Sequence, residues 1–175
     1  MNDKEYIEVL METEGKQILK ELNLNGKHSE VSVDDRGVFV ILDPIGLEYG
    51  DYSFLLHTRE LNTHNFNYKK DVYNTLKTLI IKKMGEYNQE DAIKEFSKED
   101  YVENKEDIER DVKKAYDIYS KIYNKEKKEA KERIYRLING RSGGGKTFMN
   151  SVLFKPESVY IANNILKDMN LEYIR

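Results

Sequence analysis

The fold of this chain is decided by residues 29–42, SEVSVDDRGVFVIL. Val31 and Val33 alternate with polar residues, which is the pattern of a strand with one buried face. The segment 38–42 is continuously apolar, and residues 34–37, DDRG, supply the turn between the two segments. The stretch therefore predicts a β-hairpin.

A third strand and an N-terminal helix extend this hairpin. Asp43 and Pro44 end the apolar segment, and the strand-forming residues 52–57 follow after a glycine-containing loop. Since strands joined by short connections usually pair with one another, the three strands should form an antiparallel meander. Upstream, apolar residues at spacings of three and four predict a helix over 3–23, which Gly15 is expected to bend or split.

The remainder of the chain has helical periodicity. The expected helices are one N-capped by Asn67 and ended by Gly85, a short one over 89–96 capped by Asn88, and a long one from Asn104. Their predicted buried stripes are Val72, Leu76, Leu79, Ile80 and Met84 in the first, and Ile108, Val112, Ala115, Tyr119 and Ile122 in the last. The predicted fold class is α+β, with an N-terminal helix, a three-stranded antiparallel meander and a helical C-terminal half.

The apolar stripe of the long helix is interrupted at residues 124–133, NKEKKEAKER, where no apolar residue is larger than Ala130. We therefore expect an α+β body over 1–123, a basic glycine-rich linker or loop over 124–147, and a short helical C-terminal segment over 148–175.

Composition restricts the class of protein. The chain lacks cysteine, which excludes disulfides, thiolate metal sites and cysteine nucleophiles. Its acidic, amphipathic N-terminus does not resemble a secretory signal, and its apolar runs are too short to span a bilayer. These features predict a cytoplasmic protein without a membrane partner.

A glycine-rich segment over 140–147, GRSGGGKT, matches the pattern G-x-x-x-x-G-K-[ST]. It resembles the P-loop of nucleotide-binding proteins, in which backbone N–H groups and a lysine hold phosphates. That resemblance implies an ATP- or GTP-binding enzyme that uses Lys146 and Thr147, with Mg²⁺ held by Asp43. A P-loop follows a buried strand, however, and residues 129–139 have helical periodicity. Outside this alternative we expect no cofactor and no metal.

The same segment has a second interpretation. Gly140-Arg141-Ser142-Gly143 between two helical stretches resembles the G-x-x-G loop of KH domains, which implies contact with a nucleic-acid backbone. A flexible linker is the third alternative, because three consecutive glycines cost much backbone entropy to order. The residues expected to bind phosphate or nucleic acid are Lys125, Lys127, Lys128, Lys131, Arg133, Arg136, Arg141, Ser142, Gly143, Gly144, Gly145, Lys146 and Thr147.

Charge is divided unevenly along the chain. Residues 86–111 hold 11 acidic and 4 basic residues, a net of −7, whereas residues 112–147 hold 11 basic and 4 acidic residues, a net of +7. The acidic block is either a solvated surface or a face that imitates nucleic acid and blocks a partner protein. The members of that acidic face are Glu95, Glu99, Asp100, Glu103, Glu106, Asp107 and Glu109.

These observations favour a non-enzymatic binding protein that acts on nucleic acid or on a nucleoprotein complex through a basic helix and a glycine-rich loop. The small, cysteine-free, lysine-, asparagine- and tyrosine-rich chain is similar in style to accessory proteins of phages and mobile elements, including inhibitors of host defence complexes. The choice between DNA, RNA and protein targets, and the oligomeric state, stay open.

Overall fold

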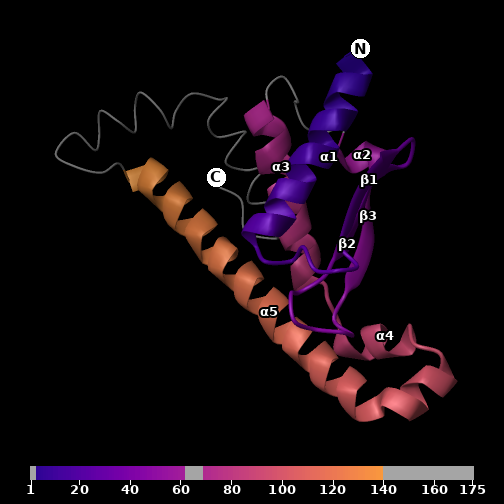
Figure 1. Ribbon diagram of the computed structural model, residues 1–175. Helices are drawn as coiled ribbons and strands as arrows, with labels where there is room; N and C mark the ends of the chain where they lie inside the picture. Colours follow the sequence, from indigo (N-terminus) through magenta and orange to yellow (C-terminus); the bar gives the residue numbers. More distant parts are fainter. Residues whose placement is uncertain (1–2, 62–68, 140–175) are drawn as a thin grey trace. The chain divides into compact units, whose positions relative to one another are not determined.

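The computed structural model describes residues 3–61 and 69–139 of the chain (Figure 1). The elements in order are α1 (Asp3–Glu21), β1 (Glu30–Asp34), β2 (Gly37–Leu42), β3 (Tyr52–His57), α2 (Thr58–Leu61), α3 (Lys69–Gly85), α4 (Gln89–Lys94) and α5 (Lys98–Asn139). The α+β fold class is confirmed for the described residues, with an N-terminal helix, a three-stranded antiparallel sheet and helices over most of residues 69–139.

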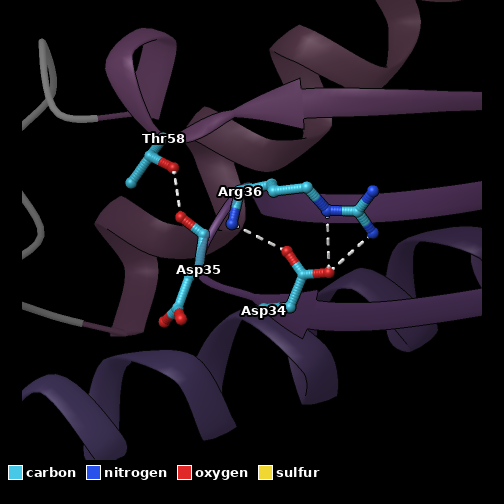
Figure 2. A network of polar contacts seen from close by, with 4 residues as sticks. All are labelled: Asp34, Asp35, Arg36 and Thr58. Atoms are coloured by element: carbon cyan, nitrogen blue, oxygen red, sulfur yellow. Dashed lines mark hydrogen bonds and ion pairs between the residues drawn. The ribbon is translucent and has the colours of Figure 1, made fainter.

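The sheet has the strand order β1-β2-β3, and both pairs are antiparallel. In the first pair Asp34 lies opposite Gly37, so that Asp35 and Arg36 alone make the hairpin loop. Figure 2 shows how this loop is held: the Asp34 carboxylate accepts hydrogen bonds from the backbone N–H and the Nη2 of Arg36, both at 2.8 Å. The Thr58 hydroxyl donates to the Asp35 carbonyl over 2.9 Å, which ties the loop to the start of α2.

The core is built from the buried apolar residues of α1, the sheet, α3 and α5. Helix α1 packs against α3 and against β1, and Figure 1 shows α1 and α3 side by side. All five residues of the stripe predicted in α3 are buried, as are the first four of the stripe predicted in α5, whereas Ile122 is half-buried. Leu19 and Ile81 are also buried, so these helices bury a wider face than one apolar stripe.

Gly15 does not split α1, which runs as one helix through it. The prediction of a break was wrong. A Cβ at Gly15 would lie 2.7 Å from Cγ1 of Val31 in β1. The glycine therefore lets α1 approach the sheet closely. It is needed for tertiary packing and does not mark a break in the helix.

The helix starts were predicted in part. Asn88 caps α4 as expected, because its side chain accepts a hydrogen bond from the N–H of Glu90 over 2.8 Å. The segment α5 begins at Lys98, where Ser97 Oγ accepts a hydrogen bond from the N–H of Asp100 over 3.1 Å. A kink at Asn104, with φ −120° and ψ 23°, divides α5 into two helices, so the long helix starts near Asn104 as predicted. The expected cap at residue 67 lies outside the described residues.

The chain divides into two compact units, residues 1–120 and 121–175. Of the second unit, the structure describes residues 121–139, the C-terminal part of α5. The expected helical segment over 148–175 lies outside the described residues. Within 3–61 and 69–139, no helix has the length and apolar character needed to cross a membrane.

Candidate functional site

The basic segment of α5 carries the first group of candidate residues. Lys125 and Lys128 are exposed, while Lys127 is half-buried with its Nζ 5.8 Å from the centre of the Tyr123 ring. Lys131, Arg133 and Arg136 lie on the same helix, although their side chains are not described. The remaining candidates, Arg141, Ser142, Gly143, Gly144, Gly145, Lys146 and Thr147, lie outside the described residues.

Helical geometry places three exposed lysines of this segment on one face. Lys121, Lys125 and Lys128 follow one another at spacings of four and three residues, and all three are exposed. At about 1.5 Å of rise per residue, they span about 10 Å of the helix axis. Glu132 continues the same face one turn further and moderates its positive charge. Lys121 was missed as a candidate, although its spacing in the sequence signals it.

The surroundings of the glycine-rich segment differ from those of a P-loop. Helix α5 continues to Asn139, so a helix and not a strand precedes Gly140. The described sheet is antiparallel, whereas a P-loop follows a strand of a parallel sheet. Both observations weaken the resemblance to nucleotide-binding proteins.

One carboxylate oxygen of Asp43, the candidate Mg²⁺ ligand, is hydrogen-bonded within the fold, whereas the other, Oδ1, has no hydrogen-bond partner among the described residues. Its side chain is only 2% exposed, and its Oδ2 accepts a hydrogen bond from the N–H of His28 over 2.7 Å. Its backbone donates to the Leu24 carbonyl and accepts from the Gly26 N–H, at 3.0 and 2.8 Å. Asp43 therefore fastens the loop after α1 to the end of β2. Among the described residues, no three His, Cys, Asp or Glu side chains group as a metal site.

The acidic face is described completely, and all seven of its members are exposed. Glu95 is the C-cap of α4, and the other six lie between the start of α5 and residue 109. Two members have partners: Asp107 pairs with Arg110 over 3.1 Å, and Glu109 accepts a hydrogen bond from the Tyr101 hydroxyl over 2.6 Å. All seven carboxylates therefore lie at the surface, and Arg110 balances the charge of one of them, Asp107.

Asp111 is a buried acid that the sequence did not distinguish from this exposed set. It is 5% exposed, and its Oδ2 accepts hydrogen bonds from the N–H groups of Glu48 and Tyr49 at 3.0 and 3.3 Å. It therefore holds the loop between β2 and β3 against α5. Its position between Ile108 and Val112, two members of the apolar stripe, is the sequence feature that could have indicated its burial.

A tyrosine cluster between the sheet and the helices was also missed. Tyr87, in the connection between α3 and α4, has its ring centre 5.2 Å from Tyr52, 5.0 Å from Tyr119 and 6.5 Å from Tyr116. Tyr119 is fully buried and donates its hydroxyl to the Gly50 carbonyl over 2.8 Å. The Tyr87 hydroxyl is also buried, yet it lacks a hydrogen-bond partner among the described residues. Burial raises the pKa of both phenols far above the usual range.

Comparison of the chain with protein-family models, with curated proteins and with solved structures gave no match in any of the three searches. Function is therefore inferred from the exposure, charge and contacts of the chain's own residues.

Proposed function

We propose that this is a non-enzymatic binding protein that contacts nucleic acid, alone or in a nucleoprotein complex. Its contact region is the basic C-terminal part of α5 together with the glycine-rich segment 140–147. The observation that carries the proposal is the set of three exposed lysines, Lys121, Lys125 and Lys128, on one face of a helix.

The physical basis is the polyanionic backbone of nucleic acids. A duplex presents one phosphate per strand about every 3.4 Å along its axis, so a face about 10 Å long meets about three of them. Lysines that neutralise these phosphates release condensed counterions, and binding becomes strongly dependent on salt. The net charge of +7 over residues 112–147 supports the same assignment.

Enzymatic nucleotide hydrolysis is the weaker alternative. It would need the segment 140–147 to hold ATP or GTP with Mg²⁺, and the helix before Gly140 argues against that. The buried hydrogen bonds of Asp43 also give this residue a structural role.

A titration with labelled oligonucleotides tests the proposal. Fluorescence anisotropy of single- and double-stranded DNA and of RNA would be measured over a range of salt, for wild type and for the triple variant K121Q/K125Q/K128Q. The matched control is K94Q/K98Q/K105Q, which removes the same charge at exposed lysines of α4 and α5. We expect the slope of log affinity against log salt to fall by about two to three only in the first variant.

Two results would contradict the proposal. Equal losses of oligonucleotide affinity in both triple variants would mean that binding depends only on the net charge of the protein. Mg²⁺-dependent binding of ATP or GTP that disappears in Lys146→Ala, without oligonucleotide binding by wild type, would instead support the enzyme alternative.

A second candidate function rests on the acidic face. Exposure of all seven members favours the proposal that this face imitates nucleic acid and occupies a basic groove of a partner protein. The similarity in style to phage accessory proteins that inhibit host defence complexes agrees with either function and stays a prediction.

A further inference from the structure

Three tyrosine rings from distant parts of the sequence meet at the surface of the first unit. Tyr52 begins β3, Tyr87 lies between α3 and α4, and Tyr116 belongs to α5. The ring of Tyr87 stands nearly perpendicular to that of Tyr52, at 83°, and is tilted by 37° from that of Tyr116. Tyr87 is buried, whereas Tyr116 is 39% exposed and Tyr52 is half-buried. The buried middle ring is therefore in contact with two rings that are more accessible to solvent.

Two carboxylates, those of Asp51 and Glu95, lie near these rings. Asp51 and Glu95 are exposed, and neither has an ion-pair partner in the part of the chain that the structure describes. After burial, the negative charges of Asp51 and Glu95 are the next largest causes that raise the pKa of Tyr87. The negative charge of Glu86 also raises the pKa of Tyr52, but Glu86 is already paired with Lys83 over 3.3 Å. The electrostatic environment of the rings is therefore negative, which disfavours an anionic ligand.

The hydroxyl of Tyr87 is a second feature of this cluster, and it is independent of the negative charge. Buried polar groups are nearly always hydrogen-bonded, as the neighbouring Tyr119 hydroxyl is to Gly50. Tyr87 is 5% exposed, and its hydroxyl has no partner within the described residues. A phenolic oxygen offers lone pairs, so an N–H group of a ligand that enters the cluster can satisfy it.

We propose that Tyr52, Tyr87 and Tyr116, with Asp51 and Glu95, bind the cationic side chain of a lysine or arginine from a basic segment of a partner protein. The ring faces attract the cation through their quadrupoles. The two carboxylates balance its charge, and the Tyr87 oxygen accepts a hydrogen bond from it. Further basic residues of the same segment would meet the acidic face that begins at Glu95. The site shares no residue with the proposed nucleic-acid contact region and does not depend on it.

A labelled hexalysine peptide is the probe, and its anisotropy with the full chain at low ionic strength is the readout. Tyr116→Leu removes a ring and should weaken binding about fivefold, whereas Tyr116→Phe keeps the ring and should bind like wild type. Tyr116 is exposed enough for either change to leave the fold intact, which a thermal melt confirms. Glu95→Gln should weaken binding, whereas Glu90→Gln, which removes the same charge at an exposed position of α4, should change it less than about twofold.

Tyr87→Phe separates a binding role from a structural one. It removes only the hydroxyl oxygen, so affinity for the peptide should fall while the melting temperature stays equal or rises. Three results would overturn the proposal: no peptide binding by wild type, full affinity in Tyr116→Leu, or equal losses in Glu95→Gln and Glu90→Gln. Self-association of the protein that Tyr116→Leu abolishes would overturn the assignment to a separate partner, because a second copy would then be the occupant.

Discussion

The hydroxyl of Tyr119 donates a hydrogen bond to the backbone carbonyl of Gly50 over 2.8 Å, and it thereby links α5 to the residue that precedes β3 by two positions. The two residues are 69 positions apart in the sequence. A Cβ on Gly50 would lie 3.1 Å from the Cβ of Ala115, so the loop approaches the helix closely at this point. The hydrogen bond and the small residues together fix where the helix crosses the end of the sheet.

Tyr119→Phe tests how much this hydrogen bond contributes to stability. The change removes the hydroxyl and leaves the Gly50 carbonyl buried without its donor, so the free energy of unfolding should fall by about 1–3 kcal/mol. Urea denaturation followed by circular dichroism measures the change. The control is Tyr116→Phe on the same helix, which should stay within about 0.5 kcal/mol because its side chain is exposed. Equal effects at both positions would show that the buried hydrogen bond contributes little.

Gly37 should tolerate substitution far less than Gly46. Both have a positive φ, 142° and 92°, so alanine is strained at either. A Cβ at Gly37 would also lie 1.9 Å from the Leu56 carbonyl oxygen, whereas one at Gly46 meets nothing within 4 Å. Gly46→Ala should therefore cost about 1 kcal/mol, and Gly37→Ala about 4 kcal/mol or more, in unfolding free energy. Similar urea midpoints for the two variants would contradict the close pairing of β2 and β3.

The Asp34 carboxylate should titrate at lower pH than in an unfolded chain. Its side-chain and backbone hydrogen bonds from Arg36 lower its pKa (Figure 2). Because the folded pKa lies below the unfolded value of about 3.9, its contribution to stability is present above that value and is lost as pH falls through the folded pKa. Carboxylate chemical shifts in NMR should show the pKa of Asp34 rising in Arg36→Gln.

Glu21 provides the control for that titration. Its pKa is also lowered, chiefly because it accepts a hydrogen bond from the Tyr73 hydroxyl. Arg36→Gln should therefore leave the pKa of Glu21 low, whereas Tyr73→Phe should raise it and leave Asp34 unchanged. A rise at both carboxylates in either variant would indicate a general loss of structure instead of two separate contacts.

The sequence predicted those parts of the fold that depend on local patterns. Alternation at Val31 and Val33, a turn of polar residues and a period of 3.6 in the later helices each report on neighbours within a few positions. Asp111 and Tyr87 could not be distinguished in this way. The hydrogen bond from the Glu48 N–H to Asp111 spans 63 positions, and the rings that meet at Tyr87 come from β3, from α5 and from the connection between α3 and α4.

The candidate sites also differ in whether local sequence patterns reveal them. Lys121 follows from helical spacing and belongs beside Lys125 and Lys128. The tyrosine cluster has no spacing of its own, because it exists only once β3, α5 and the connection after α3 are assembled. Surface charge is therefore visible in the sequence, whereas a site made by tertiary packing is not.

Gly15→Ala separates the effect of helix propensity at this position from the effect of packing against β1. Alanine should stabilise the interior of α1 by about 1 kcal/mol, but its Cβ would lie 2.7 Å from Cγ1 of Val31, a contact that costs about 1–3 kcal/mol. We expect a net loss of unfolding free energy in the wild-type background. In the Val31→Ala background the obstructing methyl groups are absent, so the same change should stabilise the protein. A double-mutant cycle in urea measures this coupling, which should reach about 1–2 kcal/mol. Stabilisation by Gly15→Ala in both backgrounds would mean that α1 does not approach β1 closely enough to need a glycine.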